Sequence, residues 1–82
     1  MSDNLSHLPR ELHSRSSGGI QVSLWWLPTD ERTWVAVGDI RSGAGFVVPV
    51  RSGERARDVF DHPFAYAARR GISTTANRLA AA

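Results

Sequence analysis

The stretch IQVSLWWLPTDERTWVAVGDI, residues 20–40, contains two strand patterns separated by a turn, and it decides the fold class. Over residues 20–27, apolar side chains alternate with other residues at the period of a half-buried strand. Residues 33–40 are rich in β-branched and aromatic side chains, which favour a second strand. The intervening PTDE is typical of a turn. This stretch therefore predicts an antiparallel hairpin.

A third strand is predicted from GFVVPV, residues 45–50, after the four-residue loop RSGA. Pro49 has no backbone N–H to give to a neighbouring strand, so the third strand is expected at an edge of the sheet. The result is a three-stranded antiparallel meander with residues 33–40 in the centre.

The loop lengths suggest a register in which Leu27 pairs with Arg32 and Ile40 pairs with Gly45. One face of the sheet, the predicted core, would then carry Val22, Leu24, Val35, Val37, Val48 and Val50, with Phe46 at its margin. The opposite face would carry Trp25, Leu27, Trp34, Ala36, Val47 and Pro49. A slip of one residue in the first hairpin would exchange Trp34 with Val35. In either register the neighbours Trp25 and Trp26 point to opposite faces.

Two short helices are expected after the third strand. Ser52 is a suitable N-cap for the first helix, and Glu54 suits the positive end of its dipole. Pro63 ends this helix and is favourable as the first residue of a second helix, residues 63–70. Gly71 would be its left-handed C-cap. The predicted fold is thus α+β: a three-stranded antiparallel β-meander followed by two short helices packed on one sheet face.

The corner between the two helices carries Asp58, Asp61 and His62. One interpretation is a chemical site; the other is helix capping, by His62 or Asp61, beside solvated carboxylates. A metal site would need further ligands, and His7 and His13 lie in the N-terminal arm and could reach the corner only if the arm were ordered. We therefore interpret the corner as structural and predict no catalytic residue, no metal site and no cofactor.

The domain is small. Residues 1–19 are polar and predict a flexible N-terminal arm, residues 20–72 the folded domain, and residues 73–82 a flexible tail. A chain of 82 residues without cysteine gains little stability from its own core and has no disulfides, which favours oligomerisation. No apolar run is long enough to span a bilayer and the first residues lack a signal-peptide pattern, so we expect a cytoplasmic location.

The second apolar face indicates a function in protein–protein interaction. One thin helix layer covers one face of a sheet, and exposed apolar patches commonly mark binding surfaces. We expect a non-enzymatic module that forms a homodimer or binds another protein. The predicted contact residues are Trp25, Leu27, Trp34, Val47 and Pro49. The simpler alternative is a tryptophan lying flat on a solvated sheet.

A nucleic-acid-binding or regulatory role is the second hypothesis. Residues 32–82 carry eight arginines against four acids, a net charge of +4, and Arg41, Arg51, Arg55 and Arg57 are the candidate phosphate contacts. The pI of 10.4 overstates this bias, because the chain has no lysine and its net charge is +2. The protein-interaction hypothesis ranks first because the outer face has few polar groups to read base edges.

The segments WLPTDERTWVAVGDIRSGAGFVVPV and VFDHPFAYAARRG give the chain a resemblance to small actinobacterial proteins. These proteins end in a V-F-x-H-P-[FY]-A-Y-A segment, and the similarity covers residues 22–68. The resemblance implies no activity. Three antiparallel strands followed by a helix also resemble the arm-binding domains of some integrases, which contact the major groove of DNA through the sheet.

Overall fold

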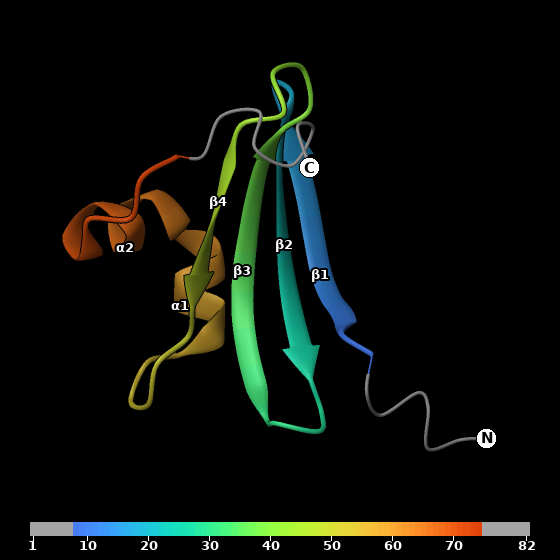
Figure 1. Cartoon of the computed structure of the whole chain (residues 1–82), viewed down its shortest axis with the longest axis vertical. Helices are drawn as coiled ribbons and strands as arrows, with labels where there is room; N and C mark the ends of the chain where they lie inside the picture. The colour runs from blue at the N-terminus through green and yellow to red at the C-terminus, as the bar shows by residue number, and fades with distance from the viewer. Residues whose placement is uncertain (1–7, 75–82) are drawn as a thin grey trace.

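The computed structural model describes residues 8–74, which form one four-stranded antiparallel sheet and two helices (Figure 1). The strands follow one another in the sheet in the order β1-β2-β3-β4. The α+β class and the meander are therefore confirmed, with one strand more than predicted. The elements are β1 (Arg10–Ser17), β2 (Ile20–Leu27), β3 (Arg32–Asp39), β4 (Gly45–Pro49), α1 (Ala56–Asp61) and α2 (Pro63–Arg70).

Strand β1 lies inside the segment that the sequence predicted to be a flexible arm, so the prediction was wrong for these residues. All eight residues of β1 are exposed, and they show no apolar alternation. The strand forms because β2 offers a free edge and because Gly18 and Gly19, with φ of 59° and 88°, make a two-residue hairpin turn. The rest of the predicted arm, residues 1–7, and residues 75–82 of the predicted tail lie outside the described residues.

The register of the first predicted hairpin is confirmed, since Leu27 pairs with Arg32. The register of the second hairpin differs from the predicted one, because Gly45 pairs with Gly38 and not with Ile40. The Asp39 carboxylate accepts the backbone N–H groups of Arg41 and Ser42, which draws Ile40 into a longer loop. Because the shift is two residues, no side chain changes face.

The core lies between the sheet and the helices. Its fully buried side chains include Val35 and Val48 from the sheet and Val59 from α1. Phe60 of α1 completes the layer, and Arg15 of β1 extends over it. The Arg15 guanidinium lies 4.7 Å from the Phe60 ring centroid and donates a hydrogen bond to the Phe60 carbonyl oxygen at 2.8 Å. The predicted core face is therefore the one that the helices cover, and we call it the inner face.

The first helix begins later than predicted. Its N-cap is Arg55, not Ser52, because Gly53 takes a φ of 87° and the Glu54 carboxylate turns back to accept the Arg51 N–H. Gly71 is the left-handed C-cap of α2 with a φ of 69°, as expected. In residues 8–74 neither helix is long and apolar enough to cross a membrane.

Candidate interaction surface

The sheet surface opposite the helices, here called the outer face, brings together all five predicted contact residues. The pairing places Trp25 beside Trp34, and Trp34 beside Pro49. Val47 is 49% exposed, while both tryptophans are half-buried. Trp26 pairs with Thr33 on the inner side, so the two neighbouring tryptophans do point to opposite faces. The described helices pack only on the inner face, so the outer face stays open.

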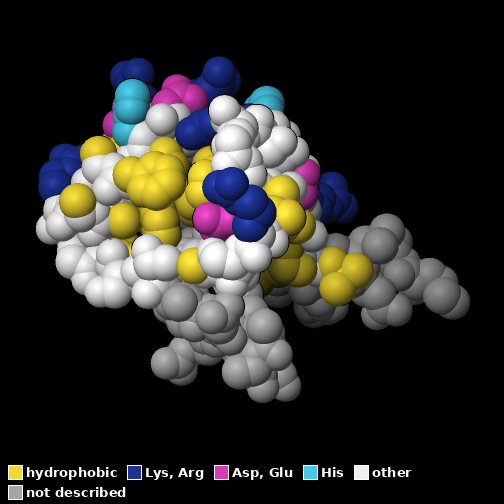
Figure 2. All heavy atoms as spheres, turned by 90° about the horizontal axis from the view of Figure 1, so that it is seen from above, with side chains coloured by type: hydrophobic (Ala, Val, Ile, Leu, Met, Phe, Trp, Pro, Cys, Tyr) yellow, Lys and Arg dark blue, Asp and Glu magenta, His cyan; other side chains and the backbone are white. Residues whose placement is uncertain are grey.

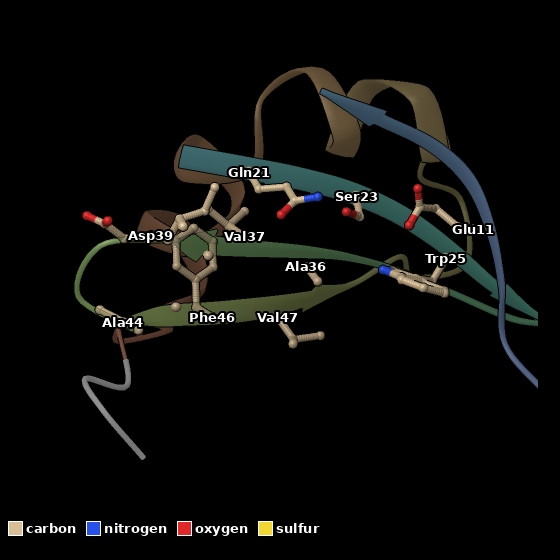
Figure 3. Close-up of a pocket in the computed structure, with 14 residues that line it drawn as sticks. Glu11, Gln21, Ser23, Trp25, Ala36, Val37, Asp39, Ala44, Phe46 and Val47 are labelled. Carbon is tan, nitrogen blue, oxygen red and sulfur yellow. The ribbon is translucent and has the colours of Figure 1, made fainter. Parts of the chain in front are cut away.

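The outer face is hollowed between Trp25 and the β3–β4 loop (Figure 3). The hollow measures about 690 Å³, and its lining includes Ala36 and Val47. Gln21 and Ser23 contribute polar side chains from β2, and Glu11 of β1 and Asp39 of β3 add carboxylates. The lining is otherwise mainly aliphatic, aromatic or backbone. Such a surface can take an apolar group.

Hydrophobic side chains also reach the end of the molecule that carries the β1–β2 and β3–β4 turns, where they lie between charged groups (Figure 2). Ile40, 68% exposed, belongs to this end. Arg41 beside it donates a hydrogen bond to the Gly18 carbonyl oxygen and forms an ion pair with Asp39 at 3.8 Å. The apolar surface thus has a charged rim.

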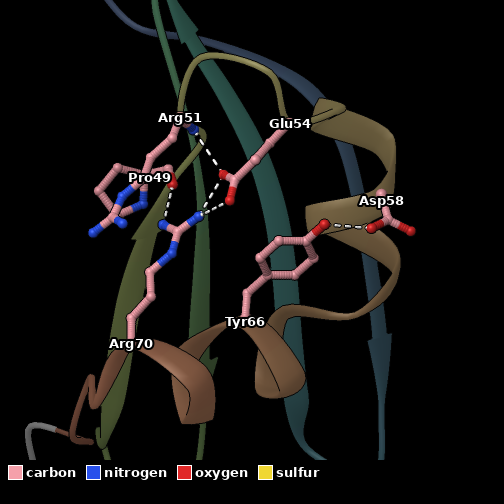
Figure 4. A network of polar contacts seen from close by, with 6 residues as sticks. All are labelled: Pro49, Arg51, Glu54, Asp58, Tyr66 and Arg70. Carbon is pink, nitrogen blue, oxygen red and sulfur yellow. Dashed lines mark hydrogen bonds and ion pairs between the residues drawn. The ribbon is translucent and has the colours of Figure 1, made fainter.

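The helix side carries a polar network that ties α2 to the end of β4 (Figure 4). Arg70 donates hydrogen bonds to the Glu54 carboxylate and, at 2.6 Å, to the Pro49 carbonyl oxygen. The Arg70 guanidinium, with the Arg51 N–H, lowers the pKa of Glu54. The ion pair is largely shielded from solvent, since the Arg70 side chain is 9% exposed and the Glu54 side chain is 24% exposed. The network therefore fastens the loop before α1.

A second contact joins the two helices at their corner. The Tyr66 hydroxyl donates a hydrogen bond to the Asp58 carboxylate (Figure 4). This bond, followed by desolvation, raises the pKa of Tyr66. Asp61 instead forms an ion pair with Arg57 at 3.3 Å.

His62 is both the C-cap of α1 and the N-cap of α2, but its side chain makes no capping hydrogen bond; its backbone N–H bonds to the Asp58 carbonyl oxygen. His62 is therefore the N-cap of α2, one of the two residues predicted for this position, but its side chain does not make the capping hydrogen bond. Among residues 8–74, no three His, Asp or Glu side chains gather to hold a metal ion.

The four candidate phosphate contacts do not form one surface. Arg41 lies in the β3–β4 loop, whereas Arg51, Arg55 and Arg57 lie beyond the far end of β4 and on α1. Around Arg55 and Arg57, a second and more polar hollow is lined also by Glu54, Asp58 and Asp61. These carboxylates offset the arginine charges, so the surface has little excess charge to attract a phosphate backbone.

Sequence reasoning missed the β1 contribution to the outer face and the glycines of the hollow. Glu11 lines the hollow from β1, and Gly38 and Gly45 line it from β3 and β4. The signal for β1 was the Gly18–Gly19 pair, because a Gly-Gly dipeptide between two strand-length segments is typical of a tight hairpin. Comparisons with protein families, with characterised proteins and with solved structures give no match to this chain.

Proposed function

We propose that this chain is a non-enzymatic protein-interaction module that pairs with a second copy of itself through the outer face. The observation that supports the proposal is the one-sided fold: both described helices cover the inner face, and the tryptophan-bearing outer face has no cover from residues 8–74. Covering apolar and aromatic side chains is the main source of association free energy.

The size of the core supports the same proposal. Among residues 8–74, the largest side chains with less than 2% exposure are those of Val35, Val48, Val59 and Pro63, and none of them is large. A domain with so small a core has limited stability on its own. A second copy would add burial without requiring a larger chain.

The test is the molar mass in solution, measured by size-exclusion chromatography with light scattering. We expect twice the 9.0 kDa mass of the chain. Trp34→Glu should weaken dimerisation by about 30-fold or more, which corresponds to the loss of a hot-spot residue. Trp25→Glu should act in the same direction, and far-ultraviolet circular dichroism should show that both variants stay folded.

The matched control is Phe64→Glu, which places the same charge on an exposed aromatic position of α2. If dimerisation came from non-specific hydrophobic contacts, Phe64→Glu would weaken it as much as Trp34→Glu does. A strictly monomeric wild type, or a Trp34→Glu variant that dimerises as well as the wild type, would contradict the proposal.

The alternative of nucleic-acid binding has less support, because the candidate arginines are separated and interleaved with carboxylates. Binding to a labelled DNA duplex that persists as salt is raised from about 50 to 200 mM would reverse this ranking, since contacts with phosphates alone weaken steeply over that range.

A further inference from the structure

The outer face has a large-to-small gradient along its strands. Three rows of cross-strand neighbours follow one another at intervals of two residues. One row carries two indole rings, the next carries small or medium side chains, and the last carries two glycines. They are the tryptophan row Trp25–Trp34–Pro49, the middle row Ser23–Ala36–Val47 and the glycine row Gln21–Gly38–Gly45.

Nothing within the same chain explains why a glycine stands at position 38. Its φ is not positive, so the backbone does not require glycine, and a Cβ added there would meet nothing within 4 Å. Gly45 differs, because its Cβ would collide with the Val37 carbonyl oxygen. A glycine inside a strand weakens the strand and often marks close approach of another group. Something from outside the sheet is therefore expected above Gly38.

We propose that the occupant is the tryptophan row of a second copy, in a face-to-face dimer whose two-fold axis runs along the middle row, perpendicular to the strands. This inference rests on the proposed function and adds the arrangement of the two copies. Rotation about that axis turns each sheet over and exchanges positions equally distant from Ala36. Trp34 of each copy then lies above Gly38 of the other, and each indole ring enters the other copy's hollow of about 690 Å³.

Charge supports the same axis. At one end of the sheet, the β2–β3 turn carries Glu31 and Asp30, and Asp30 forms an ion pair with Arg32. At the other end, Arg41 is paired with Asp39, so that end is neutral while the turn keeps the charge of Glu31. An axis perpendicular to the strands brings the acidic turn of one copy to the neutral end of its partner, whereas an axis parallel to the strands would place Glu31 against its own copy, where like charges repel.

The area of the face also fits a second copy. Four strands spaced about 4.8 Å apart, with about seven residues each at about 3.3 Å, give a flat footprint of about 440 Å² before the relief of side chains is added. Specific interfaces bury about 600–1,000 Å² of accessible surface per partner. The flat footprint of this face is below that range, so the contact needs the relief of the side chains and nearly all of the face covered. A second copy presents a face of the same extent, and we expect a dissociation constant in the micromolar range.

Crosslinking tests the axis directly, because the chain has no cysteine of its own. Arg32, the first residue of β3, and Ile40, the first residue of the loop after β3, are exposed, and each is four residues from Ala36 in the sequence. In the proposed dimer, Arg32 of one copy lies opposite Ile40 of the other at about 10 Å, the spacing of packed sheets, whereas two Arg32 positions lie about 28 Å apart. A thiol crosslinker with a span of about 10 Å separates these cases.

We expect mixed Arg32→Cys and Ile40→Cys chains to give a crosslinked heterodimer, while either variant alone gives none. Crosslinks from Arg32→Cys alone, or no crosslinks in a protein that light scattering shows to be dimeric, would overturn the arrangement and leave the proposed function intact. A monomeric wild type would overturn both.

A second variant tests the contact itself. Gly38→Leu fills the hollow and should weaken dimerisation by about tenfold or more, as overpacking does. The melting temperature of the dilute monomer should not fall, since the added side chain has free space. Wild-type affinity in Gly38→Leu would rule out the pairing of the tryptophan and glycine rows.

Discussion

At the scale of single residues, Tyr66 gives a direct probe of the helix corner. It is the one tyrosine in the chain, and its hydrogen bond to Asp58 raises its pKa. We expect its phenolate to form above the usual pH of about 10 when followed by ultraviolet absorbance. Because the folded pKa is raised, the stabilisation is present below about pH 10 and is lost as pH rises through the folded value.

Asp58→Asn should bring the Tyr66 pKa back toward its usual value, because the amide oxygen still accepts the hydrogen bond but has no charge. Asp61→Asn is the matched control: it lies on the same helix and contacts Arg57 rather than Tyr66. An equal effect of the two variants would assign the shift to the general charge of α1.

Gly38 and Gly45 allow a second prediction at this scale, independent of any dimer. Gly38→Ala should raise the free energy of unfolding by about 0.5–1 kcal/mol, because an extended residue with open space gains from the loss of glycine entropy. Gly45→Ala should lower it, because the added Cβ meets the Val37 carbonyl oxygen. Urea denaturation at low protein concentration measures both; a stability loss in Gly38→Ala would show that the space above it is not free.

At the scale of elements, the loop from β4 to α1 depends on one carboxylate. Glu54 accepts hydrogen bonds from Arg70 and from the Arg51 N–H, and these donors lower its pKa. A carboxyl group with a lowered folded pKa contributes stability above the unfolded value of about 4.3, and this stability is lost as pH falls through the folded value. We expect thermal stability to decline below about pH 4.3 and this decline to be shallower in Glu54→Gln.

The control for this element is Asp30→Asn. Asp30 also faces an arginine, but its 3.9 Å contact with Arg32 is well exposed on both sides. An exposed pair of this kind contributes little to stability. An unchanged acid profile in Glu54→Gln would mean that other carboxylates carry the pH dependence.

At the scale of the whole molecule, the proposed dimer links stability to concentration. Association favours the folded state by mass action, so each tenfold rise in protein concentration should raise the melting temperature by about 3–5 °C for a domain of this size. Trp34→Glu should remove this dependence, and Phe64→Glu should keep it. A melting temperature that is constant across concentrations in the wild type would argue for a monomer.

The sequence by itself determined the elements whose pattern is local. Apolar alternation defined β2, and the content of β-branched and aromatic residues defined β3. The adjacency of Trp25 and Trp26 alone required a tryptophan on each face. Pro63 and Gly71 placed the beginning and the end of α2. Proline fixes its own φ and restricts the residue before it, whereas glycine readily adopts the left-handed conformation of a C-cap. The outer-face cluster could be predicted for the same reason: it follows from the two-residue period of a strand.

Only the tertiary structure decided what depends on contacts between distant parts of the chain. Strand β1 has no apolar pattern of its own and gains its backbone hydrogen bonds from the free edge of β2. The β3–β4 register depends on a side-chain contact that has no periodicity, since the Asp39 carboxylate at the end of β3 accepts backbone N–H groups two and three residues further on. The loop before α1 depends on Glu54, which pairs with Arg70, a residue 16 positions away. Side chains that bind across such distances leave no periodic signal, because their partners are chosen by the packed fold and not by spacing along the chain.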